Sequence, residues 1–169
     1  MHRRRFFLIS AIAALTFSGL SDAAMVRSAL LKERVIGTWR YVSSTAKAPD
    51  GGPLWGTEPK GLMILTSHGH FSWQLFRSDR PKFVSNDRLN ATANEYKAAL
   101  NGGLAYFGTY SVNEADKIVS FRIEASTFPN SEGEELKRII TSVSGDELKY
   151  INPTTTLGAR VEAVWKRVR

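Results

Sequence analysis

Apolar and polar residues alternate along most of the second half of the chain. Segments of this kind cover residues 104–112, 118–126, 135–143 and 147–152, and short polar or glycine-containing turns separate most of them. Alternation with a period of two is typical of β-strands that bury one face. The pattern therefore predicts a series of antiparallel hairpins.

Further strands are predicted on either side of these hairpins. Residues 38–46 (TWRYVSSTA), 61–66 (GLMILT) and 70–76 (HFSWQLF) have strand character, and residues 157–168 (LGARVEAVWKRV) close the chain. About eight strands follow one another, mostly through short turns. We expect an all-β fold, an antiparallel up-and-down barrel, because closure removes the exposed edge strands of an open sheet.

Two helices are predicted beside the strands. Apolar residues recur at helical spacing just before the first strand, and Gly37 can end this short helix. A second helix is predicted at residues 92–100, inserted between strands. Thr92 and Glu95 have the spacing of a capping box, and Asn101 begins an Asn-Gly-Gly stop signal.

The alternation does not say which face of a strand points inward. In residues 70–76 a polar set opposes an apolar set: His70, Ser72 and Gln74 against Phe71, Trp73 and Leu75. A polar set facing inward would line a pocket, and one facing outward would be an ordinary solvated surface. Small residues at Ser72, Ala105 and Gly108 favour a cavity over a filled core.

The first 24 residues predict a cleaved export signal rather than part of the barrel. Arg3, Arg4 and Arg5 form a basic head, an apolar stretch follows, and small residues precede Ala24. The stretch is shorter than the ~20 residues of a membrane-spanning helix. We therefore assign residues 1–24 to a signal peptide, of general secretory or twin-arginine type, and residues 25–169 to one barrel domain. The predicted location is the periplasm or the exterior of the cell.

Composition narrows the possible chemistry. The chain lacks cysteine, which excludes disulfides, thiolate metal sites and a cysteine nucleophile. Its formal net charge is +7, and removing three arginines and Asp22 with the signal peptide leaves +7 − 2 = +5. The remaining basic residues are scattered among acidic ones, so we expect no nucleic-acid partner. No phosphate-binding loop, dinucleotide fingerprint or Gly-x-Ser-x-Gly elbow is present, and we expect no cofactor.

Two sets of residues resemble a known family. Gly37-Thr38-Trp39 is similar to the Gly-x-Trp that opens the first strand of lipocalins and other calycin barrels. More specifically, the chain resembles the bacterial lipocalin-like domain family over about residues 35–168. The matching motifs are Gly69, His70, Ser72 and Gln74; Arg77, Asp79, Arg80 and Pro81; Tyr106, Phe107, Gly108, Thr109 and Tyr110; and Phe128, Pro129 and Asn130.

The resemblance implies a barrel with a pocket but no assigned reaction. It also implies that Trp39 plugs the closed end and that a basic residue of the last strand stacks over it. Arg167 is the expected partner, because it shares a strand face with Trp165 whereas Lys166 points the other way. Gly37, Trp39 and Arg167 are thus the predicted structural signature.

Candidate site residues follow from these patterns. The predicted ligand-binding residues are Gln74, Tyr106, Tyr110, Arg122, Glu124 and Phe128. Arg122 and Glu124 share one strand face, and a surface ion pair is the alternative for them. His70 and Glu124 are the candidate catalytic acid and base, with a structural hydrogen bond as the alternative for His70. His68 and His70 lack a third histidine in the mature chain, so no metal site is expected.

Three functions remain open from the sequence. The first is an exported barrel that binds a small hydrophobic or aromatic ligand in its interior. The second is a cofactor-independent isomerase, cyclase or hydratase acting on a hydrophobic, oxygenated substrate. The third is an envelope interaction protein with a filled core. The expected partner is a small hydrophobic ligand, with no membrane span in the mature chain, which we expect to be a monomer or weak dimer.

Overall fold

The computed structural model describes residues 30–155 and 158–169. The predicted signal peptide therefore lies outside the described residues. The chain forms eight strands and three short helical segments within them. In chain order these are α1 (Leu31–Val35), β1 (Gly37–Ser44), β2 (Lys60–Leu65), β3 (His70–Phe76), α2 (Ala93–Asn101), β4 (Gly103–Asn113), β5 (Ile118–Ser126), the 3₁₀ turn η2 (Pro129–Ser131), β6 (Glu135–Val143), β7 (Glu147–Asn152) and β8 (Val161–Arg167).

The strands form one closed antiparallel barrel, as the hydrophobic alternation predicts. Each strand pairs with the next in sequence, and β8 returns to pair with β1. The closing contact brings Trp39 opposite Arg167 and Tyr41 opposite Trp165. The first and last tryptophan-containing segments therefore meet at the seam of the barrel, and no strand of the sheet is left with an unpaired edge.

Side chains of β3 show which face of the alternation is buried. Phe71, Trp73 and Leu75 are buried, whereas His70 is exposed and Ser72 and Gln74 are partly exposed on the other face. The apolar set thus faces inward, because burying aromatic and aliphatic surface is favourable and burying unpaired polar groups is not. The same rule places Tyr106 and Tyr110 of β4 inside the barrel and leaves Phe107 exposed.

The barrel is plugged at the end where α1 lies. Trp39 is fully buried, and its Nε1 donates to the carbonyl oxygen of Val35 at 2.8 Å. The guanidinium of Arg167 lies 4.0 Å from the centroid of the Trp39 ring and donates to the carbonyl oxygens of Ile36, Arg34 and Gly145. A side chain at Gly37 would collide with this guanidinium, and its φ of +135° also favours glycine.

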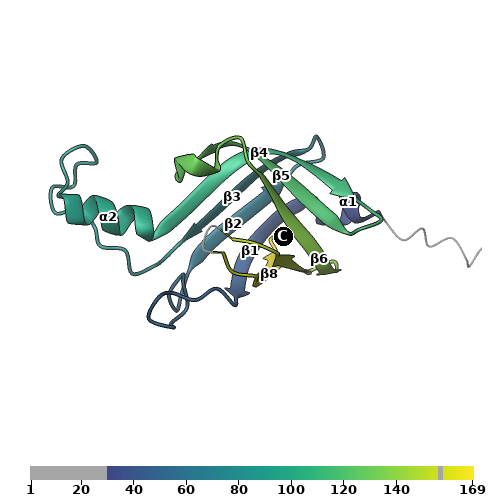
Figure 1. The fold of residues 1–169 in the computed structure, drawn as a ribbon, viewed down its shortest axis with the longest axis horizontal. Coiled ribbons are helices and arrows are strands. Elements are labelled where there is room, and N and C mark those ends of the chain that lie inside the picture. The colour runs from purple at the N-terminus through teal and green to yellow at the C-terminus, as the bar shows by residue number, and fades with distance from the viewer. Residues whose placement is uncertain (1–29, 156–157) are drawn as a thin grey trace, which may run out of the picture.

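Helix α2 projects away from the barrel at the end opposite α1 (Figure 1). Thr92 caps it: its side chain accepts from the Glu95 N–H, and the Glu95 carboxylate accepts from the Thr92 N–H at 2.8 Å. The helix begins one residue later than the predicted 92–100, because Thr92 is the cap itself, and it also ends one residue later. No side chain of α2 is buried.

None of the helices within residues 30–155 and 158–169 combines the length and the apolar character that crossing a lipid bilayer requires.

Candidate functional site

The half of the barrel away from α1 is hollow. It encloses a cavity of about 620 Å³, within the range of about 300–1,000 Å³ that small-molecule sites occupy. The half beside α1 is instead filled by packed side chains, among them Met63, Leu65 and Phe121. The cavity therefore has a closed floor and opens at the other end of the barrel, where loop residues such as Lys47 and Thr154 line it.

Aromatic rings form the inner wall of the cavity. Trp73 and Tyr106 stack with ring centroids 4.8 Å apart and planes at 16°, and Tyr150 stacks on Trp165 at 6.4 Å and 25°. Trp73 and Trp165 meet edge to face at 6.0 Å. Because these rings hold one another in place, they present a preformed apolar surface to anything that enters the cavity.

The arginine of β6, Arg138, lies at the cavity floor. It is only 4% exposed and is a lining residue between the cavity and the packed half of the barrel. Its Nη2 donates to the Tyr106 hydroxyl at 3.1 Å, and its Nη1 donates to the carbonyl oxygen of Lys137 at 2.9 Å. The guanidinium carbon lies 5.7 Å and 5.6 Å from the ring centroids of Phe121 and Tyr150.

Burial keeps the Tyr106 hydroxyl protonated. Desolvation raises the pKa of Tyr106 to about 12, although the neighbouring Arg138 charge and hydrogen bond act in the opposite direction. The Tyr106 oxygen accepts from Arg138, so its own hydrogen remains available as a donor. Arg138 and Tyr106 therefore form a paired cation and hydroxyl at the floor.

Three described residues of the cavity wall contain a buried polar atom without a partner. Within the described part of the chain, the buried side-chain atoms that lack a hydrogen-bond partner are Trp73 Nε1, Trp165 Nε1 and Asn152 Oδ1. All three residues belong to the cavity wall. Buried polar groups in native proteins are nearly always hydrogen-bonded, so these three atoms are exceptions within the described residues; protein atoms enclose them, and they do not face the open space of the cavity.

The structure brings together two of the six predicted ligand-binding residues. Tyr106 and Phe128 line the cavity, Phe128 near its exposed rim. Tyr110 is buried elsewhere in the barrel, where its hydroxyl donates to the Thr66 carbonyl oxygen at 2.7 Å and burial raises its pKa. The other three lie on the outward faces of their strands and are not lining residues: Gln74, Arg122 and Glu124.

The candidate acid and base do not meet inside the barrel. His70 and Glu124 are both exposed, and neither lines the cavity. A register shift between Phe107 and Gly108 leaves Glu124 without a residue opposite it on β4. No group of three or more His, Asp or Glu side chains able to hold a metal ion occurs in residues 30–155 and 158–169.

Sequence reasoning missed Arg138 and the small residues that make room for the cavity. Ser72, Ala105 and Gly108 are not lining residues, and Ala46 and Ala163 line the wall instead. The sequence did contain a signal for Arg138: it occupies the same face of β6 as Leu136 and Ile140, because the three residues are spaced two apart. Charged side chains usually remain in water, so the sequence alone favoured an exposed position for this arginine; the tertiary structure buries it.

A closed antiparallel barrel with one plugged end and one open interior cavity defines the class: a lipocalin-like barrel, an architecture typical of small-ligand binding. The family model described as "Lipocalin-like domain" matches residues 36–168. The chain therefore belongs to the lipocalin-like domain family.

Two solved structures are similar to this chain. A lipocalin-like protein from Bacteroides uniformis is 14% identical, with a TM-score of 0.43, and the match covers 80% of this chain and 99% of that one. A redesigned β-barrel is 13% identical, with a TM-score of 0.45, and the match covers 82% and 96% of the two chains. No curated protein sequence matches this chain.

Proposed function

We propose that this protein is an exported barrel that binds one small molecule with an apolar or aromatic body. The observation that carries the proposal is the cavity of about 620 Å³ behind a wall of stacked aromatic rings. Transfer of apolar ligand surface from water to this wall supplies about 25 cal/mol for each Å² buried. The alternative of an envelope interaction protein with a filled core gains no support, because half of the barrel interior is hollow.

Export rests on the residues before the barrel. The three consecutive arginines, the apolar stretch after them and the small residues before Ala24 together resemble a signal peptide. Expression of the full chain in a Gram-negative host tests this part separately. We expect the periplasmic fraction to contain a chain whose mass fits cleavage after Ala23 or Ala24, whereas an intact cytoplasmic chain would contradict export.

Ligand binding is tested by native mass spectrometry of the protein purified gently from its own host. We expect an adduct of a few hundred daltons that disappears on denaturation. In parallel, titration with Nile red, an uncharged apolar dye, reports whether the cavity accepts a ligand. Chromatographic comparison of the bound molecule before and after incubation would distinguish an enzyme from a carrier, because an isomerase or cyclase changes the structure of the molecule without changing its mass.

A matched pair of variants locates the binding. Ala163 is buried in the cavity wall, so Ala163→Trp places an indole in the ligand space; Ala115 is exposed in the turn between β4 and β5, so Ala115→Trp serves as the control. We expect Ala163→Trp to weaken Nile red binding at least about tenfold and Ala115→Trp to leave it unchanged. Equal binding by both folded variants would contradict the cavity as the site.

A further inference from the structure

The floor of the cavity holds a positive charge that no carboxylate neutralises. Among residues 30–155 and 158–169, no ion pair includes Arg138. Glu134 and Glu135 also line the cavity, but both are exposed and neither lies within ion-pair distance of Arg138. The groups that meet the guanidinium are instead a hydroxyl, a carbonyl and two aromatic rings.

This charge is permanent. An arginine side chain does not lose its proton in a protein, so Arg138 cannot become neutral as a buried lysine or histidine can. Burying a charge costs free energy unless an opposite charge and hydrogen bonds compensate it. Two hydrogen bonds satisfy part of its five N–H donors, and the faces of Phe121 and Tyr150 add weaker attraction.

The hydroxyl beside Arg138 is a donor as well. Tyr106 has a hydroxyl hydrogen that no described residue accepts, whereas the indole N–H groups of Trp73 and Trp165 are enclosed by protein atoms and do not reach the cavity. Asn152 Oδ1, an unpartnered acceptor, is enclosed in the same way. A ligand that meets Arg138 and Tyr106 must therefore present acceptor atoms to them, and a negative charge would complement Arg138.

We propose that the ligand is a monocarboxylic acid whose carboxylate binds Arg138 and the Tyr106 hydroxyl, while its apolar or aromatic body lies along Trp73 and Trp165 toward the mouth. This inference rests on the proposed ligand-binding function and adds its chemical class. A guanidinium matches a planar carboxylate with two parallel hydrogen bonds. One cation compensates one negative charge, so a phosphate dianion would leave excess charge among aromatic rings.

The test compares probes of nearly the same shape that carry either a carboxylate or an uncharged amide. The pairs are 1-naphthaleneacetate with 1-naphthaleneacetamide, and dodecanoate with dodecanamide, each used at neutral pH to displace Nile red from the full mature protein. We expect the carboxylate of at least one pair to bind at least about 30-fold more tightly than its amide. This factor is the lower end of the affinity range that a buried, hydrogen-bonded charge pair contributes.

Variants assign the preference to the floor. Arg138→Met keeps a long unbranched side chain without the charge, and we expect it to abolish the preference for acid over amide while Nile red still binds. Arg138→Lys should restore part of the preference, and Tyr106→Phe should reduce it. Arg40→Met is the matched control, because Arg40 is exposed on the outer face of β1.

Each outcome separates the two proposals. Nile red binding with equal affinity for acid and amide would overturn the carboxylate inference and leave the binding function standing. A folded protein that binds neither dye nor probes would overturn the binding function itself. If Arg138→Met keeps the full acid preference, the anchor is not Arg138; if that variant does not fold, Arg138→Lys and Tyr106→Phe decide the assignment.

Discussion

Two arginines inside the same barrel illustrate how surroundings decide the role of a residue. Arg167 lies over Trp39 and donates to three backbone carbonyls, so its charge is used within the protein to close the barrel end. Arg138 meets one carbonyl and one hydroxyl and faces a cavity. Arg167 thus uses three of its five N–H donors on backbone carbonyls, whereas Arg138 uses two of its five and faces the cavity.

Removing Arg167 should destabilise the barrel. Arg167→Ala removes the cation over the Trp39 ring and leaves the carbonyl oxygens of Arg34, Ile36 and Gly145 without their donor. We expect a loss of about 2–4 kcal/mol in the free energy of unfolding, measured by urea denaturation.

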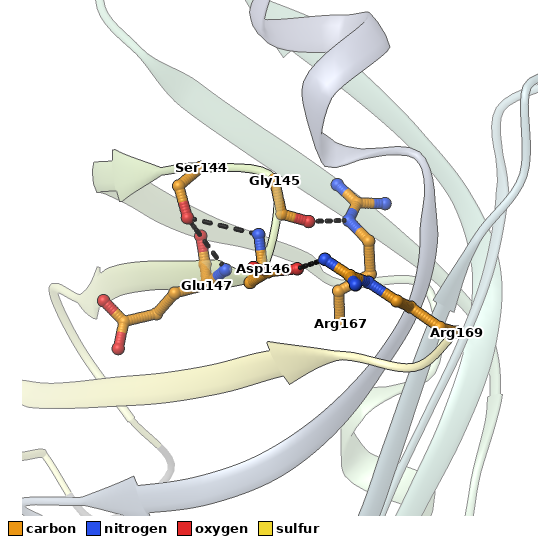
Figure 2. Close-up of polar contacts among 6 residues, drawn as sticks. All are labelled: Ser144, Gly145, Asp146, Glu147, Arg167 and Arg169. Carbon is orange, nitrogen blue, oxygen red and sulfur yellow. Dashed lines mark hydrogen bonds and ion pairs between the residues drawn. The ribbon is translucent and has the colours of Figure 1, made fainter.

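Arg169→Ala is the matched control for this measurement. Arg169 and Asp146 form an ion pair of 2.6 Å beside Arg167 (Figure 2), but their side chains are 81% and 67% exposed. Exposed pairs contribute about 0–1 kcal/mol. If the two variants lose the same stability, Arg167 is not the closing residue that the geometry indicates.

At the scale of elements, the β4–β5 hairpin contains a register irregularity. Phe107 pairs with Ala125 and Gly108 with Ile123, so β5 has one extra residue, Glu124, at this point. The bulge allows the strands to approach closely at Gly108, where an added Cβ would collide with the carbonyl oxygen of Arg122 and lie 2.9 Å from the Glu124 nitrogen. Glycine is therefore required here by space rather than by φ.

Gly108→Ala should disrupt the pairing of β4 with β5. The new methyl group meets backbone atoms, which cannot move aside as the end of a flexible side chain can. We expect a loss of about 2–4 kcal/mol in the free energy of unfolding.

Gly145→Ala provides the comparison, because nothing lies within 4 Å of a Cβ added there. Its effect should stay within about 0.5 kcal/mol, as for ordinary surface substitutions. Similar losses in both variants would show that close strand approach is not what Gly108 provides.

At the scale of the whole molecule, the barrel interior divides into a packed half and a hollow half. Trp39, Met63 and Leu65 belong to the packed half, which stabilises the fold without a ligand. The hollow half gives up that packing and keeps a polar pair, Arg138 and Tyr106, at the boundary. The packed plug and the proposed ligand cavity thus occupy different halves of the same barrel.

Because Tyr106 is buried, we expect the free energy of unfolding to decrease as the pH rises above about 10. The pKa of Tyr106 is about 12 in the folded barrel, against an ordinary value of 10.0. Because the folded-state pKa is raised, this contribution to stability is complete below about pH 10 and is lost as the pH rises toward 12. Between those values we expect wild type to lose up to about 1.4 kcal/mol per pH unit more than Tyr106→Phe, measured by urea denaturation.

The Tyr106→Phe comparison removes the contribution of the other tyrosines. Burial also raises the pKa of Tyr41 and Tyr110, and both remain in the variant. Parallel stability curves for the two proteins above pH 10 would contradict a buried, protonated Tyr106.

The sequence by itself determined the local elements and their order. Alternation identified the strands from residue 104 onward, Thr92 with Glu95 identified the capped helix, and Gly37 with Trp39 identified the first strand. These features depend on neighbours a few residues apart, so they can be predicted without knowing the rest of the chain. The up-and-down order follows because short turns join strands that are adjacent in space.

The tertiary structure alone decided which faces point inward and where the interior is empty. The alternation of β3 fits either face, and only closure of the barrel selected Trp73 over Gln74. Cavity volume is what remains after side chains from several strands have packed, so no single segment encodes it. Arg138 became a cavity residue for the same reason: closure turned the face that it shares with Leu136 and Ile140 inward, against the usual preference of a charge for water.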